Sequence, residues 1–203
     1  QKPAVAAIYK DLKEIEEYHE KDRDNCNKNI AEALPFENAI RISDLSFHYP
    51  DSERLILNEI SFDIHKNTSV AFIGQSGAGK TTLADIILGV LTPTAGSIRA
   101  DQTDITQHLD EWHRTIGYIP QNIYLMDDTI AANIAFGVPE DQIDYERIQK
   151  AIDRAQLADV IKQLPDGINT KVGERGVRFS GGQRQRIGIA RALYNEPQIL
   201  VLD

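Results

Sequence analysis

Cysteine is almost absent from this chain of 203 residues, in which only Cys26 occurs. A single cysteine forms no internal disulfide, so the sequence is no disulfide scaffold, and it fits a reducing compartment. Long apolar runs are missing too, because none approaches the roughly 18 residues that a membrane-spanning helix needs. The first residues, QKPAVAAIYKDLKEIEEY, turn polar too early for a secretory signal. We therefore expect a soluble chain, one that a longer protein could contain.

Positive charge is also scarce, with 22 Lys and Arg against 31 Asp and Glu, a net charge of -9 and a pI of about 5.0. An acidic chain is a poor non-specific ligand for DNA or anionic lipid, so no nucleic-acid partner is expected, although a local basic patch stays compatible with this balance. The 41% hydrophobic and 26% charged residues are typical of a globular protein and exclude collagen and full disorder. The length suits one α/β domain, with or without an appended arm.

The first part of the chain, residues 1–35, differs from the rest. Lys, Glu, Asp and Asn crowd residues 9–29, while Ile8, Leu12 and Ile15 fall on one helical stripe. This pattern predicts a single polar helix or linker. Two interpretations stay open: a solvated segment, or the tail of a helix that continues from an upstream domain.

From residue 39 the periodicity changes to that of strands. Alternating residues predict half-buried strands at 39–47 and 60–64. A short apolar run at 69–73 predicts a buried strand, which leads through a glycine-rich turn into a helix at 81–91. The remaining predictions are strands at 97–100 and 115–120, helices at 129–136, 145–157 and 158–164, a helix capped by Ser180 and running to about residue 194, and a fully buried parallel strand at 198–203.

The strongest motif is GQSGAGKT, residues 74–81, which fits the phosphate-loop pattern G-x-x-x-x-G-K-[ST]. Its glycines allow positive φ, so that backbone N–H groups turn inward and form an anion nest at a helix N-terminus. Lys80 can reach the β- and γ-phosphates, and the Thr81 hydroxyl can ligate Mg²⁺. The glycine order is not G-x-G-x-x-G, which disfavours a dinucleotide fold.

A phosphate loop alone does not choose among kinases, GTPases and motor ATPases, but two later features narrow the choice. The sequence FSGGQRQR, residues 179–186, opens a predicted helix with Ser180 and two glycines, which is a second anion-binding layout. The sequence ILVLD, residues 199–203, places Asp203 at the C-terminal end of a predicted parallel strand, where α/β sheets bind ligands. There a carboxylate can hold Mg²⁺ or its water.

The three features, in this order, resemble the nucleotide-binding domain of ABC transporters of the exporter type over about residues 39–203. Gln121 in YIPQN is similar to the Q-loop, Tyr49 in FHYP to the aromatic A-loop, and residues 170–176 to the exporter X-loop. The resemblance implies an α/β fold with a P-loop NTPase core, an antiparallel β subdomain and a helical subdomain at about 122–180. It assigns residues 36–203 to this domain, incomplete at its C-terminus.

The resemblance also implies functional residues, with ATP and Mg²⁺ as cofactors. Lys80, Gln121 and Asp203 would be catalytic, and Thr81, Gln121 and Asp203 would organise the metal. The residues implied to bind ATP are Tyr49, Gly74, Gln75, Ser76, Gly77, Ala78, Gly79, Lys80, Thr81, Thr82, Gln121, Ser180, Gly181, Gly182 and Gln183. Each ATP would lie between the phosphate loop of one copy and the Ser180 motif of another.

The partners implied by this resemblance are a transmembrane domain of the same transporter and a second nucleotide-binding domain, with a homodimer expected. The location would be the cytoplasmic face of the inner membrane, and general resemblance favours a lipid or glycolipid as substrate. Family members usually carry a catalytic Glu after the position of Asp203 and later a switch His, and neither follows here. We therefore expect this chain to bind Mg-ATP and to hydrolyse it very slowly.

Three other classes of protein carry similar motifs, and the sequence distinguishes an exporter domain from them. ABC ATPases of DNA repair or chromosome organisation usually separate the two anion-binding motifs by a long coiled coil, whereas here the gap runs only from Thr81 to Ser180. Translation-associated ABC proteins carry two such domains, and the exporter-like X-loop disfavours them. A module that binds nucleotide without hydrolysis could describe this chain but not a parent protein.

Overall fold

The computed structural model describes residues 32–50 and 52–203. Most of the polar helix predicted within residues 1–35, together with Cys26, lies outside these ranges. The chain divides into two compact units, residues 1–32 and 33–203, and every helix and strand named below belongs to the second unit. Across the described ranges, no helix combines the length and the apolar character required to span a bilayer.

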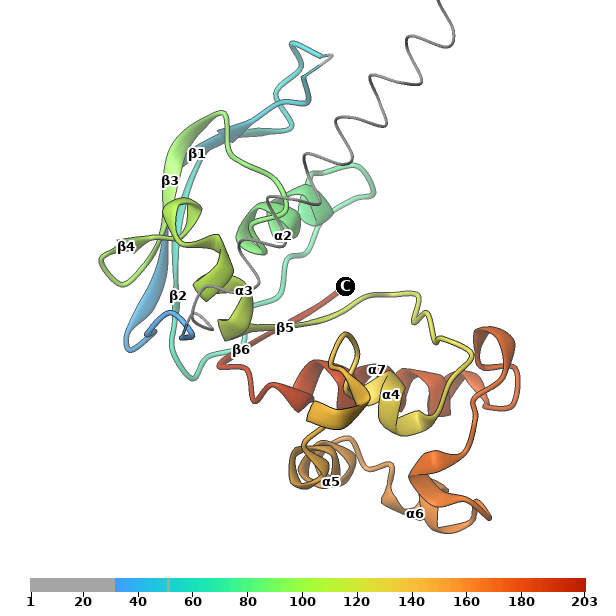
Figure 1. Cartoon of the computed structure of the whole chain (residues 1–203). Coiled ribbons are helices and arrows are strands. Elements are labelled where there is room, and N and C mark those ends of the chain that lie inside the picture. Colours follow the sequence, from blue (N-terminus) through green and yellow to red (C-terminus); the bar gives the residue numbers. More distant parts are fainter. Residues whose placement is uncertain (1–31, 51) are drawn as a thin grey trace, which may run out of the picture. The chain divides into compact units, whose positions relative to one another are not determined.

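An antiparallel sheet of four strands forms one half of this unit (Figure 1). The strands are β1 (Ala39–Phe47), β2 (Leu57–His65), β3 (Ala95–Ala100) and β4 (Thr103–Asp104), in the order β2-β1-β3-β4. The strands predicted at 39–47, 60–64 and 97–100 are confirmed, the last two as parts of longer strands. The side chains of Ile40, Ile42 and Leu45 on the inner strand β1 are almost completely buried, in one core with apolar residues of the helices that pack on this sheet.

Two helices pack their apolar side chains into the core of this sheet: α2 (Lys80–Ile87) and α3 (Leu109–Thr115), the latter preceded by the 3-10 turn η1 (Ile105–Gln107). Trp112 on α3 is fully buried, and its indole N–H donates to the carbonyl of Ile87 at 2.8 Å. The prediction that α2 runs to residue 91 was wrong by four residues. Gly89 adopts φ +77°, and the N–H groups of Gly89 and Val90 donate back to Ile86 and Asp85, which closes the helix end.

A separate pair of parallel strands, β5 (Ile116–Ile119) and β6 (Ile199–Leu202), confirms the strands predicted at 115–120 and 198–203. Full burial of β6 was wrong, because Leu200 and Leu202 are 44% and 69% exposed. The strand predicted at 69–73 was wrong as well: this segment is irregular, and Ile73 is 94% exposed. No described strand pairs with residues 69–73, so the apolar run has no sheet into which it could be buried.

Helices and short turns build the other half of the unit around a second core. They are α4 (Ile130–Ile134), η2 (Glu140–Gln142), α5 (Tyr145–Arg154), α6 (Ala158–Lys162), η3 (Gly167–Asn169), η4 (Glu174–Gly176) and α7 (Gly181–Tyr194). The helices predicted from 129 to 164 and from Ser180 are thereby confirmed. This second core gathers buried residues of α4, α5 and α7, among them Ile134, Ile152 and Ile187.

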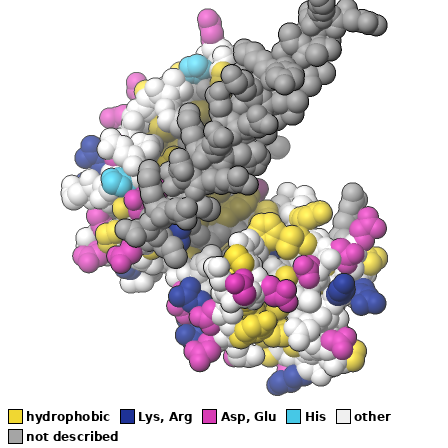
Figure 2. Space-filling view, in the orientation of Figure 1, with side chains coloured by type: hydrophobic (Ala, Val, Ile, Leu, Met, Phe, Trp, Pro, Cys, Tyr) yellow, Lys and Arg dark blue, Asp and Glu magenta, His cyan; other side chains and the backbone are white. Residues whose placement is uncertain are grey.

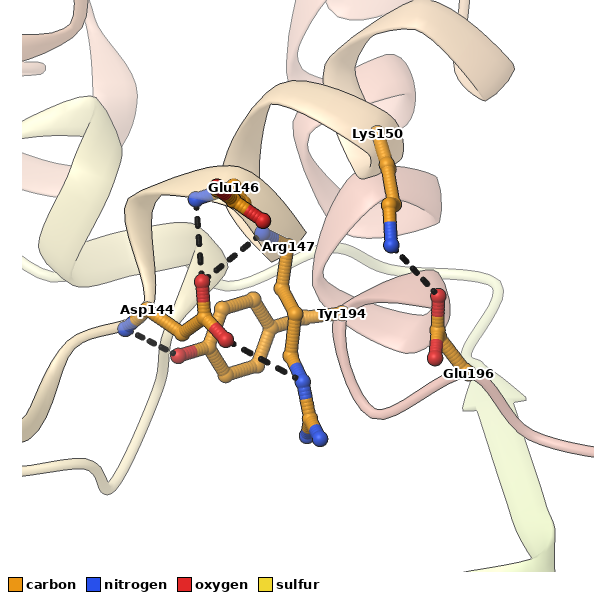
Figure 3. A network of polar contacts seen from close by, with 6 residues as sticks. All are labelled: Asp144, Glu146, Arg147, Lys150, Tyr194 and Glu196. Carbon is orange, nitrogen blue, oxygen red and sulfur yellow. Dashed lines mark hydrogen bonds and ion pairs between the residues drawn. The ribbon is translucent and has the colours of Figure 1, made fainter.

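Polar contacts fasten the start of α5 to the end of α7 (Figure 3). The Asp144 carboxylate caps α5 by accepting from the N–H groups of Glu146 and Arg147, while the N–H of Asp144 donates to the Tyr194 hydroxyl at 3.0 Å. Lys150 lies 3.6 Å from a carboxylate oxygen of Glu196, just beyond α7. The long helix α7 is therefore held at its C-terminal end by the helix that packs beside it.

Candidate functional site

The glycine-rich loop at residues 74–81 leads directly into α2. Gly77 and Gly79 have φ values of +81° and +87°, in the left-handed region that favours glycine. A Cβ on Gly79 would lie 2.9 Å from the side chain of Leu57, so the close approach of β2 also requires glycine there. A Cβ on Gly77 would meet no atom within 4 Å, which leaves open space over the loop.

The first turn of α2 offers unpaired backbone donors. Gly79 is the N-cap residue and makes no side-chain cap, and the first turn holds no acidic residue. The first hydrogen bond inside the helix joins the N–H of Leu83 to the carbonyl of Gly79 at 2.8 Å. The N–H groups of the residues before Leu83 therefore have no partner within the helix, and the helix dipole favours an anion beside them.

The Lys80 ammonium closes the loop from inside. Its Nζ donates to the carbonyl oxygens of Gly74 at 2.9 Å and Gln75 at 2.7 Å. Both acceptors are neutral oxygens of the loop itself, so a phosphate group with its negative charge would compete well for the same ammonium. Charge, open space and free N–H groups together fit a polyphosphate.

The predicted aromatic residue lies next to this helix. Tyr49 follows β1, and its hydroxyl is 3.3 Å from the Thr82 hydroxyl of α2. Its ring meets that of Phe47 edge to face, with centroids 5.1 Å apart, and Tyr49 remains 43% exposed. A ring that is fixed from one side and open on the other can stack on a planar base.

Gln121 and Asp203 lie at one edge of the parallel pair. Ile119 and Leu202 are register partners, and the N–H of Asp203 donates to the carbonyl of Ile119 at 3.1 Å. Both predicted residues therefore follow the C-terminal ends of neighbouring parallel strands, the edge where such sheets bind ligands. Both residues are also exposed.

Two residues near Asp203 were not predicted. Burial, and then the charge of Asp203, raise the pKa of Asp85 on α2. Burial and the charges of Asp203 and Asp85 likewise raise the pKa of Tyr118 on β5. These effects place Asp203 electrostatically close to the helix that begins at Lys80. An acidic residue within the apolar run of α2 is the one sequence signal that could have pointed to Asp85.

A divalent cation bound near the C-terminal ends of β5 and β6 would need oxygen ligands from several types of side chain. In residues 32–50 and 52–203, no group of three or more His, Cys, Asp or Glu side chains could hold a metal ion. Thr81, Gln121 and Asp203 contribute a hydroxyl, an amide oxygen and a carboxylate, and Mg²⁺ accepts such ligands together with phosphate oxygens. The donor set thus fits Mg²⁺ beside a nucleotide, although it would not suit a cage built from protein atoms alone.

The Ser180 motif is an exposed helix start. The Ser180 hydroxyl accepts from the N–H of Gln183 at 3.3 Å, and the Gln183 side chain accepts from the N–H of Ser180 at 2.9 Å, a reciprocal capping box. The N–H groups of Gly181 and Gly182 have no acceptor inside the helix. No described hydrogen bond joins this motif to the loop at 74–82, and the start of α7 lies apart from α2 (Figure 1).

A comparison with protein families identifies this set of motifs. The family described as "ABC transporter" matches residues 57–203, which contain the phosphate loop, Gln121, the Ser180 motif and Asp203. The chain belongs to the ABC transporter family. The α/β fold, with its antiparallel sheet and its helical half, is thereby the ABC ATPase fold.

Comparisons with curated proteins and with solved structures give the same family. The chain is 41% identical over 175 residues to an ATP-dependent lipid A-core flippase of Cupriavidus metallidurans, a match that covers 84% of this chain and 30% of the relative. It is 41% identical over 155 residues to the ABC transporter ATM1 of Toxoplasma gondii, covering 76% of this chain and 14% of that protein. The structure of a bacterial Atm1-family ABC exporter with ATP bound aligns with a TM-score of 0.74 and 38% identity, over 85% of this chain and 30% of that one. The chain thus spans less than a third of the length of these relatives.

Proposed function

We propose that this ABC domain belongs to an exporter, and that it works as one of a pair whose ATP binding and hydrolysis drive transport across a membrane. The observation that carries the proposal is the Lys80 ammonium, which bridges the Gly74 and Gln75 carbonyls at the open N-terminus of α2. That arrangement is ready to exchange two neutral acceptors for phosphate oxygens.

Nucleotide binding would use the loop and the aromatic residue together. Residues 74–82 hold the phosphates through backbone N–H groups and the Lys80 ammonium, while Tyr49 stacks on the base. The 3.3 Å contact between the Tyr49 and Thr82 hydroxyls joins the base-binding residue to the phosphate-binding helix. Binding at one end of the nucleotide therefore helps to place the other end.

Mg²⁺ would be held by Thr81, Gln121 and Asp203. When bound, it neutralises charge on the phosphate oxygens during phosphoryl transfer. Gln121 and Asp203 come from adjacent strand ends, so their relative position is fixed by the backbone pairing of β5 and β6. Lys80, Gln121 and Asp203 are the catalytic residues in this proposal.

A second copy would complete each site. Ser180, Gly181 and Gly182 present a hydroxyl and unpaired N–H groups at an exposed helix start, away from the phosphate loop of the same chain. Their contact with the γ-phosphate is therefore assigned to the partner domain, and a homodimer is the simplest pair. Bound ATP would join the two copies, and loss of the γ-phosphate would release them.

The membrane-embedded partner would meet the helical half. Tyr124 and Phe136 are 66% and 54% exposed. Hydrophobic side chains reach the surface of this half with acidic ones between them (Figure 2). Exposed aromatic residues close to Gln121 suit a protein contact better than contact with water. The domain would then lie on the cytoplasmic face of the inner membrane.

The proposed substrate is a lipid or glycolipid. The relatives named lipid A-core flippases support this class, and the acidic charge of the chain speaks against a nucleic-acid partner.

The test uses the complete transporter in lipid vesicles. We expect Mg-ATP binding by calorimetry and ATP-dependent movement of a fluorescent glycolipid, both abolished in Lys80→Ala. Lys162→Ala is the matched control, because Lys162 is an exposed lysine whose nearest carboxylate, on Asp159, is 3.8 Å away. Undiminished ATP binding by Lys80→Ala would contradict the nucleotide site, and hydrolysis without lipid movement would contradict the substrate class.

A further inference from the structure

Arg191, near the end of α7, is a partly buried cation whose neighbours are neutral oxygens. Its Nε donates to the carbonyl of Asn133 at 2.8 Å, Nη1 donates to the carbonyl of Tyr124 at 2.9 Å, and Nη2 donates to Oδ1 of Asn133 at 3.1 Å. The Phe136 ring covers the guanidinium at 4.9 Å. In the described part of the chain, no carboxylate lies within ion-pair distance of Arg191, and burial lowers its pKa. The charge therefore depends on these three oxygens.

Asn133 extends the contact to the segment that follows Gln121. It is completely buried, its Nδ2 donates to the carbonyls of Met126 and Thr129, and its Oδ1 also accepts from the N–H of Met126 at 2.9 Å. Both polar atoms of this side chain are thus satisfied, by Met126, Thr129 and Arg191. A buried network satisfied in this way holds one arrangement, because moving one member leaves the others unpaired.

Close packing also joins α7 to the segment that follows Gln121. A Cβ on Gly188 of α7 would lie 2.5 Å from the Ile123 side chain, and a Cβ on Gly176 would lie 2.9 Å from Leu125. The segment from 123 to 125 therefore lies directly against α7 and the turn before it. Gln121 lies two residues before this segment, and Ser180 is the N-cap residue of α7.

We infer that Arg191, supported by Asn133, is a positioning residue that couples the Gln121 loop to the Ser180 motif. This rests on the proposed function, in which Gln121 lies beside the metal of one site and Ser180 faces the nucleotide of the other copy. If the Gln121 segment shifted without α7, the guanidinium would lose the Tyr124 carbonyl and remain partly buried without a replacement acceptor. The loop and the helix therefore move together, and the state of one site reaches the other through a helix that touches no nucleotide at Arg191.

The experiment is a double-mutant cycle in the complete transporter, with Arg191→Lys, Gln121→Ala and the double variant. Lysine keeps the charge but cannot reach three acceptors that need the planar fork of arginine. We expect Arg191→Lys to bind Mg-ATP within about threefold of wild type and to lose at least about tenfold in kcat. In the Gln121→Ala background, the same change should have almost no further effect.

Arg147→Lys is the matched control, since Arg147 is an exposed arginine of the helical half that pairs with the N-cap carboxylate of its own helix. Should Arg191→Lys fail to fold, Asn133→Ala replaces it, because that change removes one acceptor and keeps the backbone carbonyl. The inference would be overturned if Arg191→Lys and Gln121→Ala lowered kcat by independent factors, or if Arg191→Lys left kcat unchanged. Misfolding of both Arg191→Lys and Asn133→Ala would overturn it as well. A wild-type transporter without ATP binding would instead contradict the proposed function.

Discussion

The carboxylate of Asp101 fastens the residues ahead of β1 to the turn between β3 and β4. It accepts hydrogen bonds from the backbone N–H groups of Glu37 at 2.7 Å and of Asn38 and Ala39 at 2.9 Å. The N–H groups of Glu37, Ala39 and Asn38 favour the charged carboxylate and lower the pKa of Asp101. One side chain thereby satisfies three backbone N–H groups at the point where β1 begins.

Replacing Asp101 by Asn should lower the free energy of unfolding at pH 7 by about 1 kcal/mol, a low value for charged hydrogen bonds because water screens an exposed group. Since the folded pKa is lowered, the stabilisation is complete above the unfolded value of about 3.9 and disappears as the pH falls through the folded value. Urea unfolding of wild type and variant from pH 7 to pH 2 measures this. A difference in the free energy of unfolding that does not shrink between pH 7 and pH 2 would contradict the role, and Asp159→Asn should show no such difference from wild type.

At the scale of elements, α7 makes a close contact with a segment that lies far from it in the sequence. Gly188 faces Ile123, and both Cδ1 and Cγ1 of that side chain lie within 2.9 Å of where a Cβ would be. Much of the isoleucine side chain would therefore have to move to admit a methyl group. Gly182, in the first turn of the same helix, has no atom within 4 Å of such a Cβ.

We expect alanine at Gly188 and alanine at Gly182 to change the stability of the chain in opposite directions. Gly188→Ala should destabilise the chain by about 1–2 kcal/mol, because overpacking outweighs the gain in helix propensity. Gly182→Ala should stabilise it by up to about 1 kcal/mol, because there only the propensity changes. Chemical unfolding followed by circular dichroism compares them, and equal shifts would show that Ile123 relaxes freely.

Elements with local signals were predictable from sequence. Ser180, as a predicted N-cap, marked the start of α7, and alternation located β1. The strand at 69–73 was wrongly predicted, because burial of an apolar run depends on a neighbouring strand that local sequence does not reveal. The helix α3 was missed, since its polar first turn hides the role of Trp112, which depends on packing against α2.

Residues of the candidate site were likewise predictable from sequence only where their contacts are local. Lys80 and the loop around it were predictable, because nearly all their contacts are local. The Arg191 and Asn133 network was not, because Arg191 is 58 residues or more away in sequence from the oxygens to which it donates. A polar residue inside the apolar helix 130–134 was the only hint. Long-range pairing of a buried cation with carbonyls leaves no sequence pattern.

At the scale of the whole unit, a close backbone contact between β5 and α7 connects the two hydrophobic cores. Ile98 belongs to the sheet core and Ile152 to the helical core. Between them, a Cβ on Gly117 of β5 would lie 2.6 Å from the carbonyl of Ala192 on α7, and Gln198 donates to the carbonyl of Thr115. This close backbone contact favours cooperative unfolding of residues 33–203.

Trp112, the only tryptophan, reports on the sheet core from its fully buried position. Ile152→Ala and Ile98→Ala should each cost about 2–4 kcal/mol, and both should lower the denaturant midpoint measured by Trp112 fluorescence. Fluorescence and circular dichroism should give the same midpoint in each variant. If Ile152→Ala left the denaturant midpoint measured by Trp112 fluorescence unchanged, the two cores would unfold separately.

The burial of residues ahead of the family match has a practical consequence for protein production. The match begins at residue 57, yet β1 is an inner strand of its sheet, and Leu34 and Phe36 are 7% and 4% exposed within the same core. A recombinant form trimmed to the match would leave β2 and β3 without their shared neighbour. A soluble version for crystallisation or nucleotide titration should therefore start no later than residue 33.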